Sequence, residues 1–115
     1  MEGNLENIDF IKIEEMVEDD LDFRNQLLDA IEIAVKELES AYLKGIDAED
    51  LELIKQARHK IKPTLALFGL KRISHILALG KGKMLDDGFG PWIEAHRLEF
   101  KEAALAILTE VRNYR

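Results

Sequence analysis

The sequence predicts an all-α fold, an antiparallel four-helix bundle with an additional short N-terminal helix. The 115 residues include 7 Gly and 2 Pro and few tight-turn dipeptides, a composition that favours helix over sheet. Apolar residues recur at steps of three and four, the spacing that places them on one helix face. The connections between these periodic segments are short, which is typical of helices packed side by side in antiparallel order.

The first two elements are a short helix and a long one. Residues 8–17 are expected to form the short first helix. Residues 21–43 are expected to form the first long helix, with a core face of Leu28, Ile31, Val35, Leu38 and Tyr42. Lys44 and Gly45 should end this helix as a basic last turn followed by a glycine.

A second long helix carries one apolar stripe and is expected to stop at Gly69. The stripe consists of Leu51, Ile54, Ile61, Leu65 and Phe68. Asp47 is expected to cap the start of this helix, with Asp50 three residues later in a capping-box-like position.

The third long helix is expected over residues 71–79, fraying through Gly80, Lys81 and Gly82. Residues 86–91 read Asp-Asp-Gly-Phe-Gly-Pro and are the clearest loop in the chain. The last helix should begin near Trp92 and bury one apolar face, namely Ile93, Phe100, Ala104, Ile107 and Val111.

The composition predicts a single domain, residues 1–115, because 47% hydrophobic residues supply one small core and no linker or repeat divides the chain. The absence of Cys excludes disulfides, thiolate metal sites and cysteine nucleophiles. No segment approaches the roughly 18–20 apolar residues of a membrane-spanning helix. The acidic N-terminus also lacks the order of a signal peptide. We therefore expect a cytoplasmic domain that does not contact membranes.

The charges are distributed unevenly along the chain. The net charge of −7, from 23 acidic and 16 basic residues, argues against nucleic acid as a partner. Residues 53–85, here called the basic segment, contain no Asp or Glu. They carry a charge of +8 from Lys55, Arg58, Lys60, Lys62, Lys71, Arg72, Lys81 and Lys83. The remaining 82 residues hold 8 bases and 23 acids, a charge of −15.

His59 lies inside the basic segment and is the candidate for chemistry. It falls about 140° from the centre of the apolar stripe, so it should face solvent with Lys55, Lys62 and Ala66 on its side. A neutral imidazole, with an ordinary pKa of about 6.5, can attack phosphorus. Nearby ammonium groups favour the neutral form and offset the charge of a phosphorylated product. This arrangement indicates phosphoryl transfer with a partner that brings the phosphoryl group.

Other site types do not fit the residues. A di-metal bundle site needs Glu three residues before His, but Gln56, Arg72 and Ile93 occupy those positions. Residues 80–83 lack the spacing and the Ser or Thr of a phosphate-binding P-loop, and residues 86–88 lack calcium-loop spacing. No metal site is expected. His75 and His96 are expected at helix surfaces or edges, without a role.

Residues 59–69, His-Lys-Ile-Lys-Pro-Thr-Leu-Ala-Leu-Phe-Gly, resemble the signature of histidine-containing phosphotransfer (HPt) domains. His59, Lys62 and Gly69 match the phosphorylated His, the base three residues on and the Gly ten residues on. The helix order extends the resemblance from about Ile8 to the end of the chain. The family fold is a four-helix bundle with an additional N-terminal helix, in agreement with the periodicity.

The resemblance implies a phosphocarrier of a multistep two-component phosphorelay, without kinase activity of its own. His59 would take a phosphoryl group from a receiver-domain aspartate and pass it to another, and Lys62 would stabilise the phosphohistidine. Gly69 is structural, and the expected partner-binding residues are Lys55, Gln56, Pro63 and Ala66. Receiver domains are the implied partners, with a hybrid sensor histidine kinase as a further candidate. No cofactor is expected on this monomeric chain, and Mg²⁺ would sit on the receiver.

Two positions depart from the family pattern. Arg58 stands where a small residue is common, and Pro63 stands where Gly is usual. A proline inside a helix removes one hydrogen bond and costs about 3 kcal/mol, so we expect a kink just after the active turn with the site intact. The alternative is a helix broken at Pro63, which would redirect Lys62.

Two other functions stay open. One is an HPt-like helical module that binds receivers or kinases without being phosphorylated, which Pro63 favours. The other is a small helical enzyme or metal protein, against which the missing second ligands count.

Overall fold

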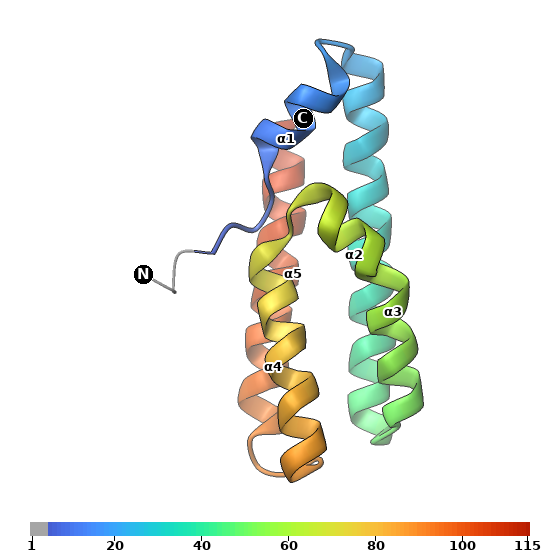
Figure 1. Ribbon diagram of the computed structural model, residues 1–115, viewed down its shortest axis with the longest axis vertical. Helices are drawn as coiled ribbons and strands as arrows, with labels where there is room; N and C mark the ends of the chain where they lie inside the picture. Colours follow the sequence, from blue (N-terminus) through green and yellow to red (C-terminus); the bar gives the residue numbers. More distant parts are fainter. Residues whose placement is uncertain (1–4) are drawn as a thin grey trace.

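The computed structural model describes residues 5–115, and those residues form five helices and no strand. The helices are α1 (Phe10–Val17), α2 (Leu21–Ala48), α3 (Leu51–Phe68), α4 (Lys71–Asp87) and α5 (Ile93–Tyr114). Figure 1 shows the four longer helices side by side, with α1 at the end that also holds the C-terminus. The all-α class is confirmed, and the arrangement is compatible with a helical bundle.

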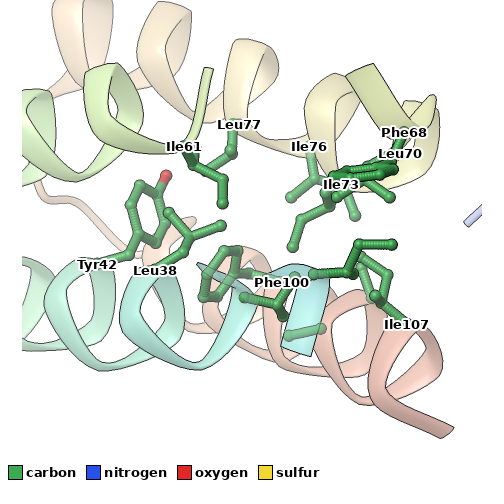
Figure 2. Packing of buried hydrophobic residues seen from close by; sticks show 14 of the residues in the cluster. Leu38, Tyr42, Ile61, Phe68, Leu70, Ile73, Ile76, Leu77, Phe100 and Ile107 are labelled. Atoms are coloured by element: carbon green, nitrogen blue, oxygen red, sulfur yellow. The ribbon is translucent and has the colours of Figure 1, made fainter. Parts of the chain in front are cut away.

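The helices do not pack evenly against one another. α2 lies along both α3 and α5, and α4 lies along α5, whereas α3 and α4 approach each other at few points. Figure 2 shows the resulting core, with Leu38 and Tyr42 of α2 facing Ile61, Leu77 and Phe100 from three other helices. The open seam between α3 and α4 positions the site described below.

Most of the predicted core faces are confirmed, with one exception that matters for the site. The expected α2 face, from Leu28 to Tyr42, is buried throughout, as are Ile54, Ile61 and Phe68 of α3. Leu65 and Ile93, also expected in the core, are partly buried. Leu51 is 51% exposed, so the expectation that it is buried with the rest of the apolar stripe is wrong. It is the first residue of α3 and lies at the open end of the seam between α3 and α4, where no other helix covers it.

The turn between α2 and α3 lies later than the sequence predicted. α2 continues through Gly45 to Ala48, and Asp50 rather than Asp47 caps α3, accepting hydrogen bonds from two backbone N–H groups at 3.1 Å. A Cβ on Gly45 would lie 2.6 Å from Ile54 Cγ1. Gly45 therefore permits close helix packing instead of ending the helix. Asp47 instead pairs with Arg97 at 2.7 Å.

α3 is a single helix that contains Pro63. The alternative in which Pro63 breaks the helix is wrong. The helix ends at Gly69 as predicted, with φ of 61°, in the left-handed region that glycine adopts without strain. The next contact is with the N-terminal segment, whose Asp9 N–H donates to the Phe68 carbonyl at 3.0 Å.

α4 is about twice as long as predicted, because it does not fray at its glycines. It runs through Gly80 and Gly82 to Asp87, so the loop covers residues 88–92 instead of starting at residue 86. The Trp92 indole N–H donates to the Gly88 carbonyl at 2.9 Å and closes this loop. α5 then begins directly after Trp92, as expected.

Gly80 allows α4 to lie directly on a buried polar pair. His96, which is 5% exposed, hydrogen-bonds through Nε2 to the Tyr42 hydroxyl at 2.8 Å. The expectation that His96 lies at a helix surface or edge is therefore wrong. A Cβ at residue 80 would lie 2.5 Å from His96 Nε2 and 2.7 Å from the Tyr42 oxygen. Because Gly80 has no Cβ, α4 can contact Tyr42 of α2 and His96 of α5 at the same point.

Alanine at the two α4 glycines should have opposite effects on stability. Gly80→Ala forces a methyl group into His96 and Tyr42, and we expect it to lower the free energy of unfolding by about 1–3 kcal/mol. Gly82→Ala meets no atom within 4 Å and should raise it by roughly 0.5–1 kcal/mol through helix propensity. Urea unfolding of both variants measures the difference. Equal effects would contradict the close packing at residue 80.

The burial of His96 predicts a loss of stability in mild acid. Burial lowers the pKa of His96 below its ordinary value of 6.5, with a smaller opposing effect from the charge of Glu99. As the pH falls below about 6.5, His96 becomes protonated in the unfolded chain before it does in the folded chain. The free energy of unfolding should therefore fall, by at most about 1.4 kcal/mol per pH unit for this one group.

Urea unfolding between about pH 7.5 and 5.5, above the range in which most carboxylates titrate, isolates this contribution. His96→Gln should remove that part of the slope, and His75→Gln, a change at an exposed residue of α4, should keep it. An unchanged slope in His96→Gln would show that another group causes the dependence.

Candidate functional site

His59 lies in the middle of α3 on its outer face. Its side chain is exposed, while Ile61 of the next turn and Ala57 of the preceding one are buried in the core. Residues 58 and 60–62 around it are helical, so the imidazole sits on rigid backbone. The geometry of the apolar stripe predicted this outward orientation.

The outer face beside His59 is a shallow depression formed within one helix. It is lined by His59, Lys62, Pro63 and Ala66, one helical turn after another. Lys62, Pro63 and Ala66 are all exposed. Three of the residues expected from the sequence to act with His59 therefore share its face. Lys12 of α1 reaches the end of this face, where its Nζ donates to the Ala66 carbonyl at 2.9 Å.

A second hollow runs along the seam between α3 and α4 and also reaches His59. Its lower part, at the bottom in Figure 1, has a volume of about 330 Å³ and is lined by Leu51, Lys55, Arg58, His59, Lys81, Met84 and Leu85. Its upper part, of about 190 Å³, is lined by Arg58, His59, Lys62, Leu65, Ser74, Leu77, Ala78 and Lys81. Because Arg58, His59 and Lys81 line both parts, we treat them as one groove, called the α3–α4 groove.

The cations of the basic segment divide into two groups according to position. Lys60 pairs with Glu37 at 3.3 Å, Lys71 with Glu6 at 3.9 Å, and Lys83 with Asp87 at 3.1 Å. The four that line the α3–α4 groove are Lys55, Arg58, Lys62 and Lys81. None of these four has a carboxylate within 4 Å in residues 5–115. Among the described cations of the basic segment, those without a carboxylate partner are thus the four beside His59 and Arg72, which hydrogen-bonds to Asn7.

Arg58 connects the groove to the buried polar pair. Burial raises the pKa of Tyr42 to about 12, and the positive charge of Arg58 acts in the opposite direction. Tyr42 therefore stays protonated at neutral pH and cannot act as a base in the groove. Its hydroxyl remains committed to His96.

The other residues expected at the site take separate positions. Lys55 lies one turn before His59, in the lower part of the groove. Gln56 is exposed and donates to Glu52 at 3.4 Å, outside the hollows that contain His59. Gly69 lies at the end of α3, where a Cβ would come 2.7 Å from Asp9 Cβ, so its part is structural.

Lys81 is the site residue that sequence reasoning missed. It lies on α4, and the expected fraying at residues 80–82 left it without a defined position. Its place in a segment free of Asp and Glu was the available signal. Once α4 is recognised as helical to Asp87, Lys81 falls opposite His59 across the groove.

In the described part of the chain, no three His, Asp or Glu side chains are grouped so that they could hold a metal ion. No helix there is both long and apolar enough to cross a membrane. Comparisons with protein-family models, with curated proteins and with solved structures found no match to this chain.

Replacing Pro63 should stabilise α3 without disturbing the groove. Pro63 has no N–H for the His59 carbonyl, and its side chain is exposed. We expect Pro63→Ala to raise the free energy of unfolding by about 1–3 kcal/mol, measured by urea unfolding. Thr64→Ala, a change at the next residue of the same helix, is the control for loss of a side chain. A destabilised Pro63→Ala would show that the ring contributes packing that outweighs the lost hydrogen bond.

Proposed function

We propose that this chain is a phosphocarrier of a two-component phosphorelay that carries a phosphoryl group on His59 between receiver-domain aspartates. The observation that carries the proposal is the combination of an exposed histidine and four unpaired cations around it. An exposed imidazole is accessible to a partner protein, and uncompensated positive charge favours a phosphoryl group on it.

The chemistry needs few groups from this chain. A ring nitrogen of neutral His59 attacks the phosphorus of an aspartyl phosphate on the partner. The N–P bond forms as the P–O bond to the aspartate breaks, and the aspartate leaves as a carboxylate. The imidazole then loses its remaining ring proton to solvent or keeps it, according to pH. The same step run backwards delivers the phosphoryl group to the next aspartate.

Lys62 is the cation placed to stabilise the phosphorylated product. It lies one turn after His59 and lines both the outer depression and the upper groove with it. Its ammonium group would donate to a phosphoryl oxygen, a hydrogen bond that is stronger when both partners are charged. Pro63 and Ala66, which share the outer depression, leave room for a docking surface.

Within this proposal the four long helices form the antiparallel bundle of the HPt family, and the monomeric chain acts in the cytoplasm. It has no kinase activity and no cofactor of its own. The receiver supplies the phosphoryl group and Mg²⁺. A hybrid sensor histidine kinase is a further candidate partner, and the receiver contact would be a small, transient one centred on His59.

Phosphoryl transfer to His59 is tested by mixing the chain with phosphorylated receivers of the source organism and following radiolabel. We expect acid-labile, alkali-stable label on the wild type and none on His59→Gln. His75→Gln, which changes an exposed histidine of α4, should be labelled like the wild type. Lys62→Ala should accept label about 10- to 100-fold more slowly, the range for loss of a hydrogen bond between charged groups.

The possible failures separate the alternatives. Label that persists in His59→Gln would show that another residue is the nucleophile. A receiver that binds the chain but never labels it would favour the non-phosphorylated interaction module. No binding and no label with any receiver would exclude both readings.

A further inference from the structure

The lower part of the α3–α4 groove has features that phosphoryl transfer does not need. It extends from His59 towards the first turn of α3 and the last turns of α4. At 1.5 Å per residue, Leu51 lies about 12 Å along the helix axis from His59. This distance exceeds the reach of a phosphoryl group on the imidazole, so the lower groove is a surface in its own right.

Three unpaired cations come together on this surface. Lys55 and Arg58 come from α3 and Lys81 from α4. Two of the nearby acidic side chains are engaged elsewhere, because Glu52 accepts from Gln56 and Asp87 pairs with Lys83. Asp86 is exposed and does not line the groove. The positive charge of the lower groove is therefore available to a ligand.

Two large apolar side chains beside these cations are exposed to solvent. Leu51 is 51% exposed and Leu85 is 75% exposed, on opposite sides of the lower groove, while Met84 between them is buried at 4%. A free phosphate or polyphosphate gains nothing from leucine side chains. A ligand that uses the whole surface carries both carboxylates and at least one apolar group.

We propose that the lower groove binds an acidic segment of a partner protein, with an apolar side chain between Leu51 and Leu85 and carboxylates on Lys55, Arg58 and Lys81. A short peptide meets only the groove, whereas a nucleic acid or an anionic membrane would extend over the rest of the molecule. Outside the basic segment the chain carries a charge of −15, which repels such extended polyanions.

The segment can bind while the outer depression stays open. The depression continues from His59 towards Ala66, and the lower groove continues from His59 in the opposite direction along α3. An acidic segment in the groove would therefore hold its protein beside His59 without covering Lys62 or Pro63. The inference concerns binding alone and does not require His59 to be phosphorylated.

The test is a titration of the ¹⁵N-labelled full chain with a short synthetic peptide of glutamates interrupted by two leucines, followed by backbone amide shifts. We expect saturable shifts confined to residues 51–59 and 77–87, weakening as salt is added. A peptide with glutamine in place of glutamate, and one with serine in place of leucine, should each bind more weakly. Inorganic triphosphate tests whether charge alone suffices.

Matched charge reversals locate the binding on the protein. Lys55→Glu combined with Lys81→Glu should weaken peptide binding by about tenfold or more, as expected for two reversed surface charges. Lys44→Glu combined with Lys101→Glu makes the same change in net charge at exposed residues outside the groove and should leave the affinity within about twofold. Leu85→Ser should weaken binding of the leucine peptide more than that of the serine peptide.

Several results would overturn the proposal. The titration would contradict it if the amide shifts did not saturate or lay mainly outside the groove. It would also be contradicted if triphosphate or the glutamine peptide bound as tightly as the glutamate peptide, or if the two double variants lost the same affinity. His75→Gln, a change at an exposed residue of α4 that does not line the groove, should bind the peptide like the wild type, and the binding needs no phosphoryl group on His59. Peptide binding in a chain that no receiver phosphorylates would thus separate failure of the proposed function from failure of this inference.

Discussion

The contact of α4 with the buried Tyr42–His96 pair determines the rest of the arrangement. Because Gly80 has no side chain, α4 can approach α5 and the polar pair within van der Waals distance at this point. This contact draws α4 towards α5, which its core side chains Ile73 and Leu77 also favour. α3 is meanwhile held by α2, so α3 and α4 are each fixed to a different neighbour. The α3–α4 groove arises because α3 packs on α2 whereas α4 packs on α5. His59 lies at the edge of this groove.

The groove in turn determines which basic side chains remain unpaired. Lys60, on the α2 side of α3, reaches Glu37, and Lys83, turned away from the groove, reaches Asp87. The side chains that point into the seam meet only the basic segment of the other helix, because neither helix carries Asp or Glu there. Apart from Arg72, the bases of the basic segment thus fall into two classes on the surface, those that reach a carboxylate and those that face the groove without one.

The sequence was sufficient for the parts of the structure that depend on local spacing. The core face of α2, the end of α3 at Gly69 and the outward position of His59 all follow from helical periodicity or from the backbone freedom of glycine. The errors arose where a glycine serves packing between helices. The sequence predicts helix ends at Gly45 and near Gly80, but each glycine makes room for a side chain from another helix, Ile54 and His96 respectively. That partner is distant in sequence, and one chain read alone contains no signal of it.

The same limit explains what was missed at the site. His59 and Lys62 share one helix, so their proximity follows from a spacing of three residues. Lys81 joins them only because two helices lie on opposite sides of a seam, which depends on the packing at Gly80. Leu51 was assigned to the core because its spacing fits the stripe, yet the stripe extends one turn beyond the region that other helices cover.

Stability alone gives no reason for four unpaired cations along one groove. The chain has 23 acidic residues, and an Asp or Glu at an exposed α4 position beside the groove, such as Ala78, would remove mutual repulsion between the four cations. The apolar residues Leu51 and Leu85 on the same surface also lose the contribution that burial would give them. An acidic, partly apolar segment in the groove would reduce both effects. Its carboxylates would offset the repulsion between the cations, and its apolar side chain would shield the two leucines from water. Binding of one such segment would therefore remove both unfavourable features. Because the groove borders His59, the protein that carries the segment would lie where phosphoryl transfer to His59 would occur.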